Sequence, residues 1–436
     1  MKLSITKAYQ INIVLRQASL IVLSILLVKS GVATEEIGFF ETLMFVSTTV
    51  SFFWLNAFIQ GALVQYPSVS DIEKPVVKFN IFLVTNLFSL LVLIVLLLFK
   101  PPFLSLMTGH TDLPFYPVFC FYIFLNLPPY LLESFWTAEN RPLSILLYAV
   151  VSHILLPLSI MLPIWMGYGL EISIWGMVVV SFLRYAWMLS YILQNAAFAI
   201  QIPIIQSFLI LCLPLVGYTF LGGFVTTFSN WLVNWHFEGD KTIFAIYRFG
   251  AREFSLSLAL ATGMSSAIVP FLASQKVENQ NLTVLKDKSV RLWHVLFPVS
   301  ITLMLTSNWL FPTIFSQDFS ESAGIFNIYL LLLLSRAVFP QSILLALKAT
   351  SLILKISIIE AVFIIILSLV LVFPWGLAGI AWATVAGFLL EKILMIIILK
   401  NKYGIGFQDY TEVKLYILYS LLLIAAYFIQ RIGYSF

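Results

Sequence analysis

Charged residues and cysteines are both scarce in this chain of 436 residues. Only 10% of the residues are charged, against about 25% in an average soluble protein. Cys120 and Cys212 lie in apolar runs, and neither a disulfide framework nor a zinc site can be built from them. The net charge of +4 is small and spread along the chain, which argues against a nucleic-acid partner.

Motifs for nucleotide hydrolysis and for common hydrolytic chemistry are missing as well. The sequence contains no G-x-x-x-x-G-K-[ST] loop, no H-E-x-x-H and no G-x-S-x-G. We therefore expect a protein that is not an enzyme and that uses no cofactor or metal. Any work on a substrate must then come from an ion gradient, the membrane potential or the substrate's own gradient.

Hydrophobic residues, in contrast, make up 61% of the chain. A soluble fold could not bury so much apolar surface, so lipid is the natural solvent for the excess. About 20 apolar residues are needed for a helix to cross about 30 Å of hydrocarbon. This criterion predicts an all-α polytopic membrane protein with spans near residues 9–30, 36–66, 77–99, 115–138, 142–166, 171–193, 204–236, 242–273, 290–315, 322–346, 350–373, 376–399 and 413–430.

The Lys and Arg residues of the loops predict the orientation of these spans. With the N-terminus in the cytoplasm, 13 of them fall on the inner side and 4 on the outer side. We therefore expect a cytoplasmic N-terminus. The longest inner loop would then lie around Gln275–Ser289.

The two halves of the chain share a weak internal repeat at an offset of 207 to 208 residues. The matched pairs include Gly169 with Gly376, Trp175 with Trp382, Ser134 with Ser342 and Ala138 with Ala346. Six predicted spans separate the copies, so both copies have the same orientation in the membrane. We expect a parallel 6+6 repeat with six-helix bundles at residues 1–199 and 200–402, and one additional C-terminal helix within 403–436.

Polar residues within the predicted spans mark candidate site positions, because a charge is costly inside lipid. Arg16 shares a face of the first span with Asn12, and Arg248 and Arg252 lie one turn apart on the eighth. We interpret all four as lining a wet cavity that binds substrate. Arg16 has a second interpretation, in which its side chain reaches the cytoplasmic surface.

Asn230 and Asn234 on the seventh span belong to the same predicted cavity, although such a stripe also serves to join helices. Glu41 on the second span either binds substrate or neutralises one of the arginines. Glu41, Glu133 and Glu360 are the candidates for proton or sodium coupling.

Two segments of the sequence follow a known pattern. An arginine-bearing first span precedes Ile37-Gly38-Phe39-Phe40, and the second half restarts with Phe244-Ala245-Ile246-Tyr247-Arg248-Phe249-Gly250-Ala251-Arg252. Ala267-Ile268-Val269-Pro270 closes the eighth span. In these features and in its helix layout, the chain resembles the polysaccharide and oligosaccharide-lipid flippases of the multidrug/oligosaccharidyl-lipid/polysaccharide (MOP) exporter superfamily.

The resemblance implies two six-helix bundles around a cationic cavity in a bacterial inner membrane. Its cargo would be a polyprenyl-diphosphate-linked oligosaccharide, moved to the periplasmic leaflet for surface polysaccharide synthesis, with a polysaccharide polymerase as a partner. Three alternatives remain open: an ion-coupled drug or metabolite exporter, a peptidoglycan lipid precursor flippase, and a membrane scaffold that transports nothing. Precursor flippases typically have two extra C-terminal helices, whereas one is predicted here.

Overall fold

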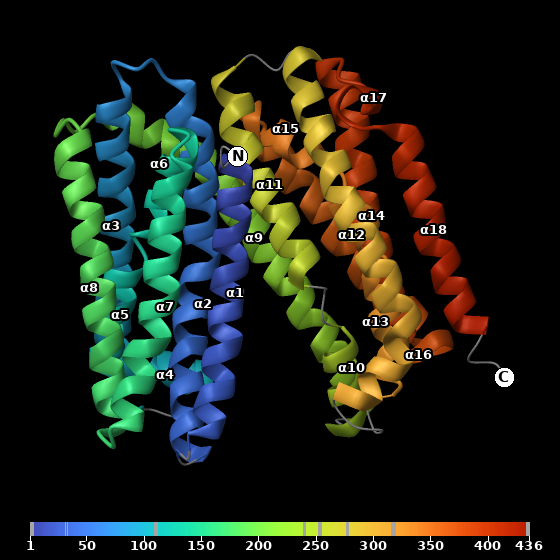
Figure 1. Cartoon of the computed structure of the whole chain (residues 1–436), viewed down its shortest axis with the longest axis horizontal. Coiled ribbons are helices and arrows are strands. Elements are labelled where there is room, and N and C mark those ends of the chain that lie inside the picture. The colour runs from blue at the N-terminus through green and yellow to red at the C-terminus, as the bar shows by residue number, and fades with distance from the viewer. Residues whose placement is uncertain are drawn as a thin grey trace. The chain divides into compact units, whose positions relative to one another are not determined.

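The computed structural model shows a chain built from helices (Figure 1). It describes residues 4–30, 32, 34–108, 112–238, 241–251, 255–275, 279–314 and 320–432. The contacts divide the chain into two compact units, one formed by Met1–Val216 with Val269–Ser274 and the other by Gly217–Ile268 with Gln275–Phe436. The predicted boundary at residues 199 and 200 lies just before α9, and the division between the units falls inside that helix.

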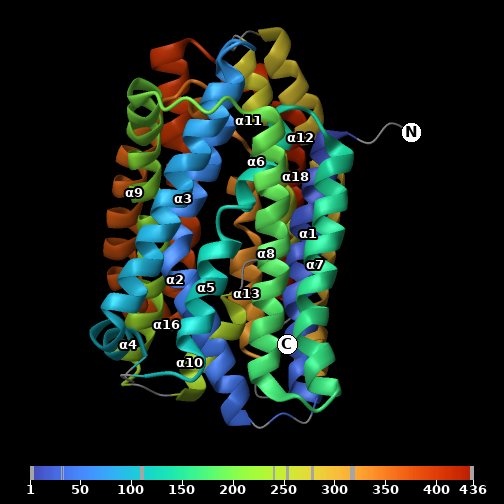
Figure 2. The same cartoon turned by 90° about the vertical axis from the view of Figure 1, so that its left-hand side faces the viewer.

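The first unit contains the helices of the N-terminal half. They are α1 (Ile5–Lys29), α2 (Thr34–Gln65), η1 (Tyr66–Ser68), α3 (Lys74–Leu98), α4 (Lys100–Thr108), α5 (Tyr116–Asn126), α6 (Tyr130–Ala138), α7 (Pro142–Trp165) and α8 (Gly169–Asn195). Within this unit α7 packs against both α1 and α8 (Figure 2). Buried aromatic residues of α5 to α8, among them Tyr116, Phe135 and Tyr148, form much of its core.

The second unit begins within α9 (Ile202–His236). It continues with α10 (Lys241–Gly250), α11 (Ser255–Ser274), α12 (Asn279–Ile314), α13 (Ser322–Leu330), α14 (Leu333–Arg336), α15 (Pro340–Ala346), α16 (Thr350–Tyr403), α17 (Phe407–Tyr410) and α18 (Val413–Ile432). The end of α11, Val269–Ser274, is grouped with the first unit.

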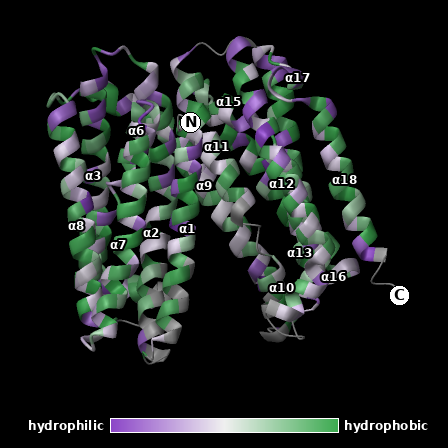
Figure 3. Ribbon diagram, in the orientation of Figure 1, coloured by the Kyte–Doolittle hydropathy of each residue, from purple (hydrophilic) through white to green (hydrophobic). Residues whose placement is uncertain are grey.

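The helices confirm the prediction of an all-α polytopic membrane protein. Nine helices of the described residues are long and apolar enough to cross a membrane, or ten if the bent pair Ser322–Arg336 and Pro340–Ala346 is one span. Hydrophobic residues run along most of their length (Figure 3). Each predicted span overlaps a helical segment of the described chain, and two of the spans fall on α16.

A glycine marks the same point in both halves. Gly376 interrupts α16 with a φ of 54°, and its repeat partner Gly169 is the first residue of α8, with a φ of 75°. Positive φ is strained for residues with a side chain and free for glycine. The repeat match at these positions therefore has a backbone cause, since each glycine turns the chain into the last helix of its half.

One detail of the predicted layout was wrong. The expected loop at Gln275–Ser289 is helical from Asn279 onward, because its sequence contains no proline or glycine to stop a helix. The predicted span at 115–138 is confirmed as one candidate membrane span, Tyr116–Ala138, although Pro128 and Pro129 separate α5 from α6 within it. Proline lacks the backbone N–H that a continuous helix needs, so the helix is interrupted at these residues and α6 begins after them.

Candidate functional site

An ion pair lies at the centre of a polar cluster in the first unit. One guanidinium nitrogen of Arg16, Nη2, donates to both oxygens of Glu133, at 2.8 and 2.6 Å. Asn12, one turn before Arg16 on α1, donates its amide to the same carboxylate at 2.8 Å. Arg16 is the twelfth residue of α1, about 16 Å from the start of the helix. The guanidinium thus bonds inside the unit and does not reach back to the surface along its helix.

The amide of Asn12 also contacts α7. Its Oδ1 lies 3.1 Å from Nε2 of His153. Because the NH₂ group of Asn12 donates to Glu133, its oxygen must accept from the histidine, which assigns the donor hydrogen to Nε2. Asn12 is fully buried, so both ends of this amide are fixed by the helices around it.

A second arginine, Arg184, also lies against the Tyr130 ring. The Tyr130 ring has the Arg16 guanidinium at 4.8 Å from its centroid and the Arg184 guanidinium at 5.0 Å. Arg184, from α8, donates from Nε to the Tyr148 hydroxyl at 3.0 Å and from Nη1 to the Asn126 carbonyl oxygen. Its Nη2 has no hydrogen-bond partner among the described residues.

The charges of this cluster do not balance. Two guanidinium groups and one carboxylate, that of Glu133, lie among the residues described around Tyr130, and the carboxylate pairs with Arg16. The side chain of Glu133 is 3% exposed, whereas that of Arg16 is 28% exposed. Buried charges are normally paired, so an excess of positive charge inside a membrane unit suits the binding of an anionic group.

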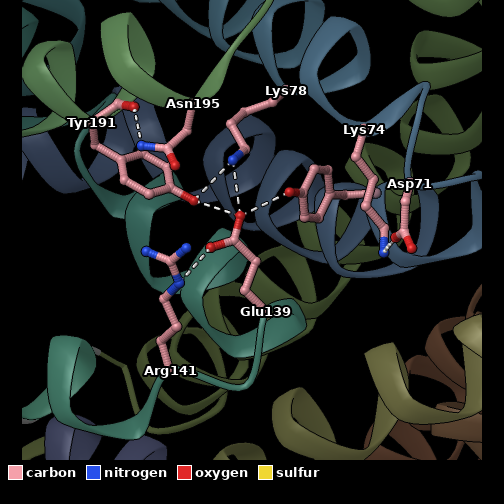
Figure 4. A network of polar contacts seen from close by, with 8 residues as sticks. Asp71, Lys74, Lys78, Glu139, Arg141, Tyr191 and Asn195 are labelled. Atoms are coloured by element: carbon pink, nitrogen blue, oxygen red, sulfur yellow. Dashed lines mark hydrogen bonds and ion pairs between the residues drawn. The ribbon is translucent and has the colours of Figure 1, made fainter.

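A different carboxylate, Glu139, organises the junction of α6 and α7 (Figure 4). Its Oε1 accepts from Lys78 at 2.8 Å, from the Tyr66 hydroxyl at 2.8 Å and from the Tyr191 hydroxyl at 2.6 Å. Arg141 Nε lies 3.0 Å from Oε2. Burial alone would raise the pKa of Glu139, but these donors outweigh it and hold the pKa below the ordinary value. The carboxylate thus ties η1, α3 and α8 together.

The second unit contains its own buried polar cluster. Lys392 bonds to Glu391 at 2.7 Å and lies 3.4 Å from the Gln341 side-chain oxygen, which also accepts from Tyr218 at 3.3 Å. Glu360 is buried within electrostatic reach of Glu391, Lys392 and Arg336. Here two carboxylates face two cations, so the charges balance.

Arg248 and Asn230 take no part in the described contacts of either cluster. Arg248 is exposed on α10, with its guanidinium 5.9 Å from the Phe244 ring, and the Asn230 amide donates to the Thr226 carbonyl of its own helix at 3.1 Å. Arg252 and the side chains of Glu41 and Asn234 lie outside the part of the chain that the structure describes. Their roles stay predictions.

A cavity of about 1130 Å³ lies within the second unit. Its walls come from α10, α13, α16 and α18 and include Trp375, Trp382 and Phe428, with Glu321 and Arg431 among the few charged residues. This mainly apolar lining suits hydrocarbon better than a diphosphate. It is distinct from the Arg16 and Glu360 clusters.

Known proteins with similar features are transporters and flippases. The family described as lipid II flippase MurJ matches residues 238–434. No curated protein sequence matches the chain. A mutant of the Vibrio cholerae MATE transporter VcmN has a TM-score of 0.75 at 13% identity, covering 91% of this chain and 96% of its own.

Two further solved structures are similar to the chain in fold. The bent form of VcmN from Vibrio cholerae has a TM-score of 0.72 at 13% identity, covering 96% of this chain and 98% of its own. An outward-facing multidrug resistance MATE transporter of the MOP superfamily has a TM-score of 0.71 at 13% identity, covering 91% and 95%. The chain therefore has the fold of these MATE transporters.

Proposed function

We propose that this protein flips a polyprenyl-diphosphate-linked glycan from the cytoplasmic to the periplasmic leaflet of a bacterial inner membrane. The observation that carries the proposal is the excess positive charge around Arg16, Glu133 and Arg184 inside a membrane unit. Arginine presents forked N–H donors that match phosphate oxygens. A partly exposed guanidinium near the middle of α1 can therefore bind the diphosphate while the lipid tail stays in hydrocarbon.

The glycan distinguishes two versions of this function. An oligosaccharide unit for surface polysaccharide is the first candidate, from the resemblance of the arginine-bearing segments. Lipid II is the second, because the lipid II flippase family matches residues 238–434. Both cargoes share the polyprenyl diphosphate, so the same arginine chemistry serves either one.

A drug exporter is the main competitor, because the solved structures with this fold include a multidrug transporter. An excess of positive charge disfavours organic cations by electrostatic repulsion. The proposal extends to a cytoplasmic N-terminus, to a polysaccharide polymerase as partner and to coupling with protons or sodium. For coupling, Glu360 is the best supported of the three predicted carboxylates, since it is buried among ionisable groups of the second unit.

The test is a translocation assay in proteoliposomes with four cargoes. These are a polyprenyl-diphosphate-linked oligosaccharide, lipid II, the same oligosaccharide on a polyprenyl monophosphate, and a fluorescent organic cation. Translocation of either diphosphate lipid in preference to the monophosphate lipid supports the proposal and identifies the glycan. Transport of the cation alone would replace the flippase with an exporter.

A further inference from the structure

We infer that Glu133 is a displaceable counter-ion, which occupies the anion site of Arg16 until a cargo phosphate takes its place and which then pairs with Arg184. This inference rests on the proposed function, because it assigns a role to Glu133 in binding the same diphosphate. It differs from ion coupling at Glu133, since no proton or sodium ion has to bind there.

The contact between Arg16 and Glu133 leaves room for a better partner. Glu133 uses only Nη2 of Arg16, and the Nε of Arg16 has no hydrogen-bond partner among the described residues. The guanidinium fork is therefore not saturated, although two parallel bonds are the strongest arrangement for a carboxylate or phosphate. A phosphate that engaged the fork would make a better set of bonds than Glu133 makes.

A phosphate can reach Arg16 more easily than it can reach Glu133. The Arg16 side chain is 28% exposed, whereas Glu133 is 3% exposed and also accepts from the buried Asn12. An incoming phosphate thus meets the arginine first and the carboxylate lies behind it. Asn12 can keep its bond to Glu133 while Arg16 changes partner.

Glu133 needs a new cation once a phosphate has taken its place at Arg16. A buried carboxylate without a cation is strongly destabilising, so the exchange requires a second cation within reach. Tyr130, one turn before Glu133 on α6, has Arg16 and Arg184 at 4.8 and 5.0 Å from its ring centroid. Arg184 is 5% exposed, is bonded only to neutral oxygens of Tyr148 and Asn126 in the described contacts, and has an unpartnered Nη2.

The charges then balance better with cargo than without it. Before binding, Arg16 pairs with Glu133 and Arg184 has neutral partners. After binding, Arg16 pairs with a phosphate and Arg184 with Glu133. At the repeat offset of 208, the position of Glu133 corresponds to Gln341 in the second unit, where Lys392 already pairs with Glu391. The unbalanced arrangement is thus a property of the first unit.

Binding of farnesyl diphosphate to the purified full chain tests this exchange, with farnesol as the uncharged control. Glu133→Gln removes the competing charge, and we expect it to bind farnesyl diphosphate about tenfold more tightly than the wild type, with farnesol unchanged. Arg184→Gln removes the receiving cation and should weaken binding. The double variant should regain the tight binding of Glu133→Gln, because no carboxylate then needs a new partner.

Glu133→Asp, which keeps the charge on a shorter side chain, covers the case in which Glu133→Gln does not fold, and it should bind more weakly than Gln and more tightly than the wild type. Wild-type binding that Glu133 and Arg184 substitutions leave unchanged would overturn the exchange and leave the flippase proposal standing. A folded wild-type protein that binds no diphosphate at all would overturn both.

Discussion

The carboxylate of Glu133 accepts hydrogen bonds from the guanidinium of Arg16 at 2.6 and 2.8 Å, although 117 residues separate the two in sequence. This pair joins α1 to α6 inside the first unit. With Arg184 it forms the proposed cargo site, and it also contributes to the stability of that unit. The two roles can be separated by experiment.

Arg16→Ala should destabilise the protein, because it leaves Glu133 buried without its partner. Removing one member of a buried ion pair typically costs about 3–5 kcal/mol. The paired substitution of Arg16→Met with Glu133→Leu should recover much of this loss, since apolar residues of similar size often replace a buried pair without penalty. Thermal unfolding in detergent measures both. A double variant less stable than Arg16→Ala would contradict this description of the pair.

Glu139 should make stability depend on pH in a defined direction. Its pKa in the folded protein lies below the ordinary value of 4.5, so its stabilisation is complete above that pH and is lost as the pH falls through the lower, folded-state pKa. We expect Glu139→Gln to lower the stability by about 1–2 kcal/mol at pH 7. The difference from the wild type should shrink in acid. The exposed Glu171→Gln is the control, and a difference that grows in acid would refute the assignment.

Gly376→Ala should strain the junction inside α16. The φ of 54° at Gly376 favours glycine, and a side chain there costs about 1–3 kcal/mol. Gly222→Ala is the matched control, because Gly222 lies inside α9 with open space around the added methyl group. That control should be neutral or slightly stabilising, since alanine favours helix. Equal unfolding temperatures for the two variants would argue against a special backbone role for Gly376.

Glu360→Gln tests ion coupling without disturbing the Arg16 site. If Glu360 carries the coupling ion, the variant should flip cargo at a rate that no longer responds to an imposed proton or sodium gradient. The exposed Glu321→Gln should retain the wild-type response. A gradient response that survives in Glu360→Gln would exclude this carboxylate from coupling.

Much of the fold could be predicted from hydrophobic run length alone, because every span had to be apolar and about 20 residues long. The Gly169 and Gly376 match also located a real backbone feature in both halves. What could not be predicted was the start of α12. The charged segment after Asn279 is helical, although a loop was expected there.

The partners within the site could not be predicted in the same way. The sequence placed Arg16 and Glu133 in separate roles, as a cavity residue and as an ion-coupling candidate. Which side of α6 meets α1 depends on tertiary packing, and hydropathy carries no information about it. Glu139 was missed because a carboxylate in a short loop gives no signal, and its partner Lys78 lies 61 residues away.

The most direct test of the account is translocation of a polyprenyl-diphosphate-linked glycan in proteoliposomes by the wild type, Arg16→Ala, Arg16→Lys and the exposed-arginine control Arg291→Ala. We expect Arg16→Ala to lose at least about 90% of the wild-type rate and Arg16→Lys to retain part of it, since lysine keeps the charge but lacks the fork. Arg291→Ala should match the wild type. Full activity in a folded Arg16→Ala protein would contradict the central claim that this arginine binds the cargo's diphosphate.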